Sequence, residues 1–484
     1  DLITTLNQAT TVLNAQNDAR TNRSGETMIG SFGRIMYNYA GRYYFTGSVR
    51  RDGSSRFGQD NKWGVFPSMS TAWRISDEQF FEPLKKYIND LKIRGGWGVI
   101  GNAGIANYLA LSTLNSTSYV LGSSSTVSAG YLDSKVANSK LGWETTTDYS
   151  IGSDMQLLNS RITLSIDYFY RKTTDMLFNM PLPTITGFSS YMANIGAMRN
   201  RGFEYTVNSR NLTGPFKWTT DFNLSYYRNR VLDIGKDKRP LIIDNCYTTE
   251  GKPLAGLWGM VNLGVYKDWE EVKTQPIVNA ANPLWKNRTS PGMPKVADVN
   301  GDGIIDASDN TIIGSAIPDF VWGMTNSFEY KGFDLSVQVN GVQGGDINML
   351  EYTGVFGRGA GTMNTTYEYY NNYWRPDRTD AKYPAPTRKN YEGTDLSGTL
   401  IYKGTYINIQ NISLGYTLPK QLAKRAGMGS VRVYSTIQNA LFITKFPGFN
   451  PETNFKGDQT TSQGIDRGAY PLARTVSFGL NISL

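Results

Sequence analysis

The residues with the clearest capacity for chemistry form an acidic loop that runs from Asp298 to Asp309 and reads DVNGDGIIDASD. Oxygen-bearing side chains occupy loop positions 1, 3, 5, 9 and 12, and glycine occupies position 6. This spacing is typical of a calcium loop, in which oxygen ligands surround the ion and glycine permits a sharp turn. The predicted ligands are Asp298, Asn300, Asp302, Ile304 (through its backbone carbonyl), Asp306 and Asp309. A metal-free turn rich in Asx residues is the alternative.

A second candidate site is a group of aromatic residues in a polar stretch. The residues are Tyr367, Tyr369, Tyr370, Tyr373 and Trp374, with glutamate and asparagine among them. Flat aromatic faces beside amide and carboxylate groups can bind sugar rings, so we predict that these five residues contact a substrate. Packing within the loop, or contact with a protein partner, is the alternative interpretation.

Composition excludes several classes of catalytic site. The 484 residues include no histidine and one cysteine, Cys246. A histidine-dependent triad, an internal disulfide and a cysteine-based metal site are therefore impossible within this chain. Because no other arrangement of residues resembles a catalytic site, we expect no enzymatic activity. The net charge of +8 comes from scattered residues, which argues against nucleic-acid binding.

The elements that position these residues are predicted to be long β-strands. Apolar and polar residues alternate in many segments, up to the end of the chain, where one face carries Val476, Phe478, Leu480, Ile482 and Leu484. A strand of about ten such residues has an apolar and a polar face and can cross a bilayer when tilted. The side chains expected to face lipid include Ile162, Leu164, Ile166, Phe478, Leu480 and Ile482.

The alternation predicts thirteen strands, at 28–39, 43–52, 63–75, 91–100, 145–157, 161–172, 196–209, 216–228, 320–330, 333–342, 404–416, 431–443 and 474–484. The connections between them alternate in length, with long ones at 101–144, 173–195, 229–319, 343–403 and 444–473. Outer-membrane barrels have short periplasmic turns and long extracellular loops. The predicted fold is therefore all-β, a transmembrane antiparallel β-barrel with long extracellular loops, and a secreted carbohydrate-binding protein is the competing class.

The strand count also bears on the completeness of the barrel. If the last strand ends in the periplasm, thirteen strands place the start of the chain outside the cell. Bacterial barrels have an even number of strands and both ends in the periplasm. We therefore expect an odd number of strands before Asp1, so that this chain is the C-terminal portion of a barrel. The calcium-type loop would lie outside the cell within 229–319, where Leu254 to Val265 could hold two further short strands.

Several motifs, in the same order, resemble the SusC/RagA family of TonB-dependent outer-membrane transporters. They are Arg51-Asp-Gly-Ser-Ser-Arg-Phe-Gly58 followed by Trp63-Gly-Val-Phe-Pro-Ser68, Tyr330-Lys-Gly-Phe-Asp-Leu335 with Gly341-Val-Gln-Gly344, Asn411-Ile-Ser-Leu-Gly-Tyr416 and Tyr470-Pro-Leu-Ala-Arg-Thr475. The resemblance implies a barrel of about 22 strands around a plug domain. Residues 1–484 would be the C-terminal portion of that barrel, and the plug domain and N-terminal strands would lie outside this chain.

The resemblance also implies a function. It implies import of oligosaccharides across the outer membrane of a Gram-negative bacterium, energised by the TonB complex. The expected partners are a SusD-like surface lipoprotein and the lipids of the outer membrane. Import of oligopeptides within the same family remains an alternative, as do a passive porin and a secreted carbohydrate-binding protein.

Overall fold

A computed structural model of the chain describes residues 24–121, 126–235, 238–278, 290–350, 364–386, 397–425, 427–457 and 459–483. Leu484, predicted as the last apolar residue of the final strand, lies outside these described residues. The regular structure is mostly β. The helices are short: α1 (Trp269–Thr274), α3 (Tyr367–Asn372) and α4 (Lys420–Arg425), with 3-10 helices η2 (Ile75–Asp77), η3 (Gln79–Leu84), η4 (Thr184–Thr186), η5 (Ala307–Asp309) and η6 (Ser397–Leu400). Among the described residues no helix has the length and apolarity needed to span a membrane.

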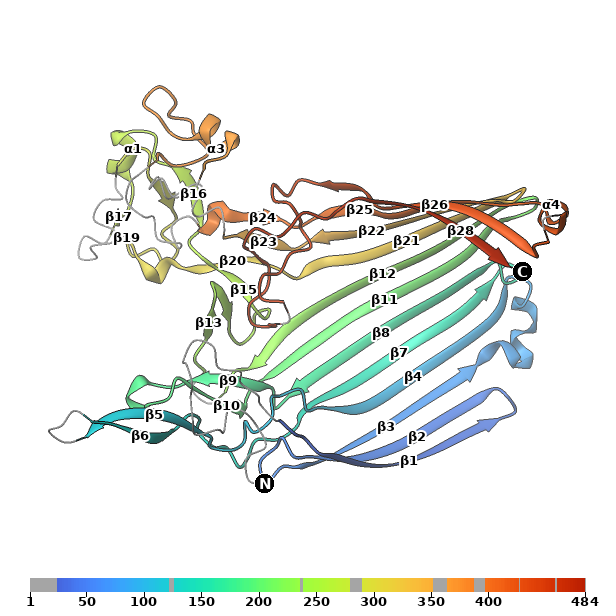
Figure 1. The fold of residues 1–484 in the computed structure, drawn as a ribbon, viewed down its shortest axis with the longest axis horizontal. Coiled ribbons are helices and arrows are strands. Elements are labelled where there is room, and N and C mark those ends of the chain that lie inside the picture. Colours follow the sequence, from blue (N-terminus) through green and yellow to red (C-terminus); the bar gives the residue numbers. More distant parts are fainter. Residues whose placement is uncertain are drawn as a thin grey trace. The chain divides into compact units, whose positions relative to one another are not determined.

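The largest sheet has thirteen strands, and they follow one another in chain order. They are β1 (Met28–Tyr39), β2 (Tyr43–Ser54), β3 (Trp63–Arg74), β4 (Ile88–Asn102), β7 (Glu144–Leu157), β8 (Ile162–Thr174), β11 (Ala197–Thr213), β12 (Phe216–Asp233), β21 (Pro318–Tyr330), β22 (Phe333–Gly344), β25 (Tyr406–Thr417), β26 (Ser430–Thr444) and β28 (Thr475–Ser483). All thirteen predicted strands are confirmed, with ends that differ by a few residues. The predicted all-β, antiparallel architecture is confirmed as well (Figure 1).

The chain divides into two compact units. The described part of the first unit lies within 24–73, 94–150 and 171–198, and it includes the antiparallel ladders β1–β2 and β2–β3. The second unit comprises 74–93, 151–170 and the chain from 199 onward, and its ladders run from β12 through β21, β22, β25 and β26 to β28.

The alternation of short turns and long connections is also present. Lys331 and Gly332 join β21 to β22 and both have positive φ, 47° and 89°, as a two-residue hairpin turn requires. In Figure 1 this end of the second unit also carries α4, and the small loop sheets lie at the opposite ends of β12, β21, β22 and β25. One end of this unit is therefore compact, and the other carries the large insertions.

The long connections form short strands of their own. They are β5 (Leu114–Leu121), β6 (Thr126–Asp133), β9 (Leu177–Pro181), β10 (Ser190–Asn194), β13 (Leu241–Ile243), β14 (Cys246–Thr248), β15 (Gly256–Gly259), β16 (Asn262–Val265), β17 (Ile277–Val278), β18 (Pro294–Val296), β19 (Ile304–Ile305), β20 (Thr311–Ser315), β23 (Asp346–Met349), β24 (Ile401–Lys403) and β27 (Ile465–Asp466). The two short strands expected in 254–265 are β15 and β16. Because both pair within the loops, they leave the count of thirteen unchanged.

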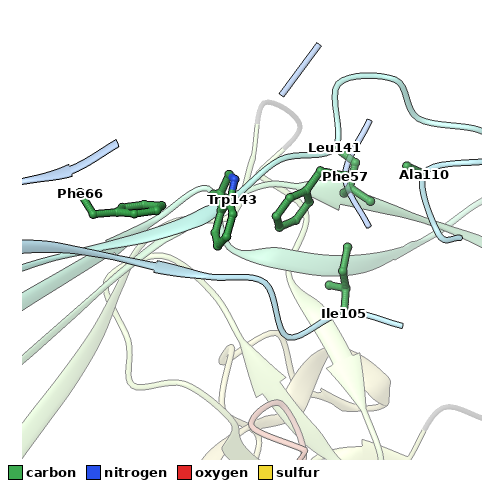
Figure 2. Packing of buried hydrophobic residues seen from close by; sticks show 6 residues of the cluster. All are labelled: Phe57, Phe66, Ile105, Ala110, Leu141 and Trp143. Carbon is green, nitrogen blue, oxygen red and sulfur yellow. The ribbon is translucent and has the colours of Figure 1, made fainter. Parts of the chain in front are cut away.

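In the first unit, aromatic side chains hold the connections together. Figure 2 shows the ring of Trp143 between those of Phe66 and Phe57, at centroid distances of 5.2 Å and 4.9 Å. The Trp143 indole N–H also donates to the Lys62 carbonyl, at 3.0 Å. Gly101 lies against these rings, where an added Cβ would be 2.2 Å from the Phe66 ring. The connections after β2 and after β4 thus share one apolar core.

The last strand separates an apolar from a polar face, as predicted. The exposed apolar residues on one face are Val476, Phe478, Leu480 and Ile482. On the other face Gly479 lies against the ring of Tyr434, and the neighbouring Arg432 pairs with Asp334. The charged pair and the exposed apolar residues therefore lie on opposite faces of the sheet, which suits a sheet with lipid on one side.

Candidate functional site

The acidic loop lies between β18 and β20 and is held by hydrogen bonds from its own backbone. The two carboxylate oxygens of Asp298 accept from the backbone N–H groups of Gly301 and Gly303, at 2.7 and 2.9 Å. In the same way Asn300 accepts from the N–H of Asp302, and Asp302 accepts from that of Ile304. These bonds close successive Asx turns around the loop.

The C-terminal half of this loop is a capping box on η5. Asp306 accepts from the backbone N–H of Ser308, and Asp309 accepts from that of Asp306, both at 2.8 Å. The second carboxylate oxygen of Asp309 accepts from the N–H of Val299, at 2.8 Å, and this side chain is fully buried. Asp309 therefore fastens the two ends of the loop together.

This arrangement fits a metal ion only in part. In the portion of the chain that the structure describes, no three acidic or cysteine side chains converge as a metal-binding group. Asn300, Asp302 and Ile304 are exposed. Asp298 and Asp306 are half-buried, so solvent can reach five of the six predicted ligand residues. Asp309 alone among the six is buried, and its two carboxylate oxygens, like those of Asp298, accept from backbone N–H groups.

The aromatic group divides into buried and exposed members. Tyr369 is 5% exposed, packs with Tyr383 and Leu400, and donates from its hydroxyl to the Pro384 carbonyl at 3.0 Å. Its ring is part of the loop core, as the packing alternative proposed. Tyr367 and Tyr370, both in α3, are 87% and 57% exposed.

The other two members are half-buried. Tyr373 packs against the loop core, and Trp374 donates from its indole N–H to the Lys267 carbonyl at 3.1 Å. Trp374 therefore joins the connection after β22 to the connection after β12. Only Tyr367 and Tyr370 present large ring faces for a substrate among the five predicted contacts.

The sequence did not indicate the role of Glu368, which holds this aromatic loop. Its carboxylate accepts from the Lys382 ammonium at 2.6 Å and from the Tyr383 hydroxyl at 2.7 Å. These two donors hold the pKa of Glu368 below its usual value. The partners lie 14 and 15 residues along the chain, which is too far for a local sequence pattern to reveal.

We expect acid to loosen this loop. Because the folded-state pKa of Glu368 is lowered, its stabilising effect is complete above the unfolded value of about 4.3 and is lost as pH falls through the lowered value. Glu368→Gln should remove this pH dependence at a cost of about 1 kcal/mol or less, because the side chain is about half exposed. Proteolysis of the loop at a series of pH values would measure it. The control is Glu270→Gln, at an exposed glutamate paired with Lys273, and an equal effect of both changes would contradict the expectation.

A cavity that the sequence does not indicate lies on one face of the sheet in the first unit. It measures about 640 Å³, and its lining combines small polar residues, among them Ser48, Ser68 and Ser150, with larger ones such as Phe66. Asp52 at its edge is 6% exposed and pairs with Arg50. Among the described residues, the other oxygen of Asp52 has no hydrogen-bond partner. Such a polar surface suits the water-facing side of a transmembrane sheet.

Comparison with known proteins identifies the family. The model of the family described as "TonB dependent receptor-like, beta-barrel" matches residues 2–440. This chain belongs to that family. Family members are transporters of the Gram-negative outer membrane rather than enzymes.

The relatives agree with the predicted resemblance to the SusC/RagA family, which is confirmed. TonB-dependent receptor P3 of Formosa agariphila is 34% identical over 470 residues, covering 94% of this chain and 45% of that protein. TonB-dependent receptor SusC of Bacteroides thetaiotaomicron is 31% identical over 474 residues, covering 94% and 44%. The chain therefore spans about half the length of the curated relatives that it matches.

A solved structure shows the same fold. The structure described as "Structure of the RagAB peptide transporter" aligns with a TM-score of 0.79 at 22% identity, covering 94% of this chain and 47% of the other. The match supports the strand order of the large sheet. At this identity it carries no information about the substrate of the present chain.

Proposed function

We propose that this chain is part of an active transporter that imports oligosaccharides across the outer membrane of a Gram-negative bacterium. The observation that carries the proposal is the family match over residues 2–440, together with a thirteen-stranded antiparallel sheet that has apolar and polar faces. TonB would supply the energy, and a SusD-like surface lipoprotein would cooperate in capturing the substrate. Membership in a TonB-dependent family favours this function over a passive porin or a secreted carbohydrate-binding protein.

Exposed aromatic rings favour glycan as the substrate. Tyr367 and Tyr370 present ring faces to solvent at one end of a loop rich in carboxylate and amide groups. Aromatic faces suit the apolar faces of sugar rings, and the polar groups suit their hydroxyls. Oligopeptide import is the second candidate, because the same fold occurs in a protein described as a peptide transporter.

Growth on defined nutrients tests the substrate. A strain that lacks the full-length receptor should fail to grow on at least one oligosaccharide as sole carbon source and should grow normally on peptides. Restoring the full-length gene should restore growth. Normal growth on every glycan, with loss of growth on peptides, would establish the peptide importer instead.

We also propose that the loop from 298 to 309 binds calcium. The proposal rests on the ligand spacing and on the position of Asp298, Asn300 and Asp302, of which the first is half-buried and the other two are exposed. The Ile304 carbonyl would be a further ligand. Asp306 and Asp309 would complete the predicted set, although their capping bonds compete with this role. A bound cation would stiffen the insertion between β12 and β21, which contains α1 and β16 to β19.

Metal dependence distinguishes this proposal from a plain Asx-rich turn. We expect calcium to protect the loop from proteolysis and a chelator to remove that protection. In the double variant Asp298→Ala/Asp302→Ala, the loop should be cleaved readily with or without calcium. Both changes remove metal ligands as well as hydrogen bonds of the turn. The control is Asp380→Ala, at a fully exposed carboxylate. If wild-type cleavage is the same with calcium and with chelator, the turn needs no metal.

A further inference from the structure

A small cavity in the second unit has the chemical character of a sugar-binding pocket. It measures about 230 Å³ and lies where the connections after β22 and β26 meet. Consecutive glycines with positive φ, Gly344 and Gly345, turn the chain from β22 into β23 along its edge. The sheet β24–β23–β27 supports this edge, and Figure 1 shows β23 and β24 near the ends of β22 and β25.

The polar side chains of this cavity include hydrogen-bond acceptors beside the donors of Thr453 and Gln463. The Oδ1 atom of Asn454 is buried and, among the described residues, has no hydrogen-bond partner. The Glu452 carboxylate and the Tyr406 hydroxyl both belong to the lining, and a carboxylate can accept from several donors at once. A buried acceptor without a donor is costly, so a ligand that brings donors would be favoured here.

The acceptors come from two different segments. Asp346 belongs to β23, and its two oxygens accept from the Lys403 ammonium at 2.7 Å and from the backbone N–H of Ser315 at 3.0 Å. Its charge is therefore compensated. Glu452 and Asn454 belong to the connection after β26. A ligand that fills the cavity must therefore present hydrogen-bond donors to both segments and apolar groups to the lining between them.

Apolar groups complete the lining. Val342, Ile347 and Pro451 contribute aliphatic surface between the polar groups. Tyr406, which is 8% exposed, packs against the tilted ring of Phe442 at a centroid distance of 4.9 Å, so its hydroxyl has a fixed position. A sugar ring, which has hydroxyls around its edge and C–H groups on its faces, matches this combination of polar and apolar lining groups.

We propose that this cavity, with Glu452, Asn454 and Tyr406 as its polar contacts, binds one hexose unit of a saccharide. The inference rests on the proposed import of glycans and adds a site for one sugar ring. Glu452 and Asn454 would accept from neighbouring hydroxyls. The residues lie outside the aromatic group at 367–374 and outside the acidic loop.

The test uses the full-length receptor, purified in detergent, with methyl glucoside, methyl galactoside and methyl mannoside as probes. Saturation-transfer NMR detects weak binding of this kind. We expect at least one hexoside to bind. Asn454→Ala should weaken that binding about five- to tenfold, and the isosteric Glu452→Gln about three- to tenfold, as expected for the loss of one hydrogen bond each. The control Gln459→Ala changes an exposed side chain of the same connection and should alter binding less than about twofold.

The competing hypothesis is that this cavity binds a cation. The same variants distinguish the two hypotheses. Glycylglycine and methylammonium serve as probes at low and high salt. If they bind, and if Glu452→Gln or high salt abolishes that binding while hexosides do not bind, the pocket holds an ammonium and the proposal is wrong. It is also wrong if hexosides bind equally to all variants that retain the wild-type unfolding temperature.

The outcome is separable from that of the transport proposal. Hexoside binding is measured on purified protein and needs no energised uptake. If growth on a glycan depends on the receptor but no hexoside binds, the pocket inference alone fails. If a hexoside binds at this pocket but no growth on glycans depends on the receptor, the import proposal alone fails.

Discussion

Replacing Leu480 with arginine is expected to destabilise the folded protein by about 2–4 kcal/mol, the cost of a charge on the lipid-facing side of a barrel near the membrane midplane. Leu480 is near the middle of β28, opposite Val433 in β26, and both side chains are exposed. Arginine at this position would have to displace its charge toward the membrane surface along a strand with apolar residues on the same face. Urea unfolding of the full-length receptor in lipid vesicles would measure the change.

The control is Ser477→Arg on the opposite, polar face of the same strand. Ser477 pairs with Thr436, and a charge there would point toward water in a membrane-embedded sheet. We expect this variant to unfold within about 1 kcal/mol of wild type. Equal destabilisation by the two arginines, or none from Leu480→Arg, would contradict a lipid-facing position.

Replacing Trp143 with alanine is expected to cost about 3–5 kcal/mol in local stability. Trp143 is 8% exposed, lies between two aromatic rings and satisfies the Lys62 carbonyl. Alanine would leave a cavity between the rings of Phe57 and Phe66, the two other aromatic residues of this cluster. The strands should persist, because their ladders do not depend on this ring, so the loss should be confined to the connections.

Limited proteolysis, with the cut sites identified by mass spectrometry, would locate the effect. New cuts are expected within 103–143 and 55–62. The control is Trp63→Ala, because Trp63 is 50% exposed and its ring contacts the Arg51 guanidinium at 4.6 Å. If Trp63→Ala exposes the same sites at the same rate, the proposed loop core does not hold these connections.

The strands could be predicted because their signal is local. Alternation of apolar and polar residues with a period of two, over ten or more residues, reports a strand with two different faces wherever it occurs. Tight turns such as Lys331-Gly332 add a second local signal. Thirteen strands and the alternation of connection length followed from these two signals alone.

The interior of the connections could not be predicted in the same way. Strands such as β23 and β27 have only two to four residues, and residues more than 100 positions apart pair in them. Such pairing depends on what tertiary structure brings together rather than on any local pattern. The burial of Tyr369 has the same origin, because the residues that cover it, Tyr383 and Leu400, come from later in the chain.

The acidic loop shows a different limit. Asp298, Asn300 and Asp302 satisfy both a calcium spacing and a series of Asx turns, because the same oxygen positions serve a cation or a backbone N–H. Composition and spacing therefore predict the turn but leave its ligand open. Asp309 is the informative residue, since its complete burial and two backbone donors define a fastening role that the spacing alone does not reveal.

The bonds between the long connections of the second unit have a consequence for how these connections move. Trp374 holds the connection after β12, Asp346 holds the backbone at Ser315, and β23 pairs with β27 from the connection after β26. These contacts join the three insertions into one cooperative unit. The conformational entropy of all three is therefore lost in a single ordering step. A ligand that orders any one of them should slow hydrogen exchange in all three, and a cut in one should speed exchange in the others.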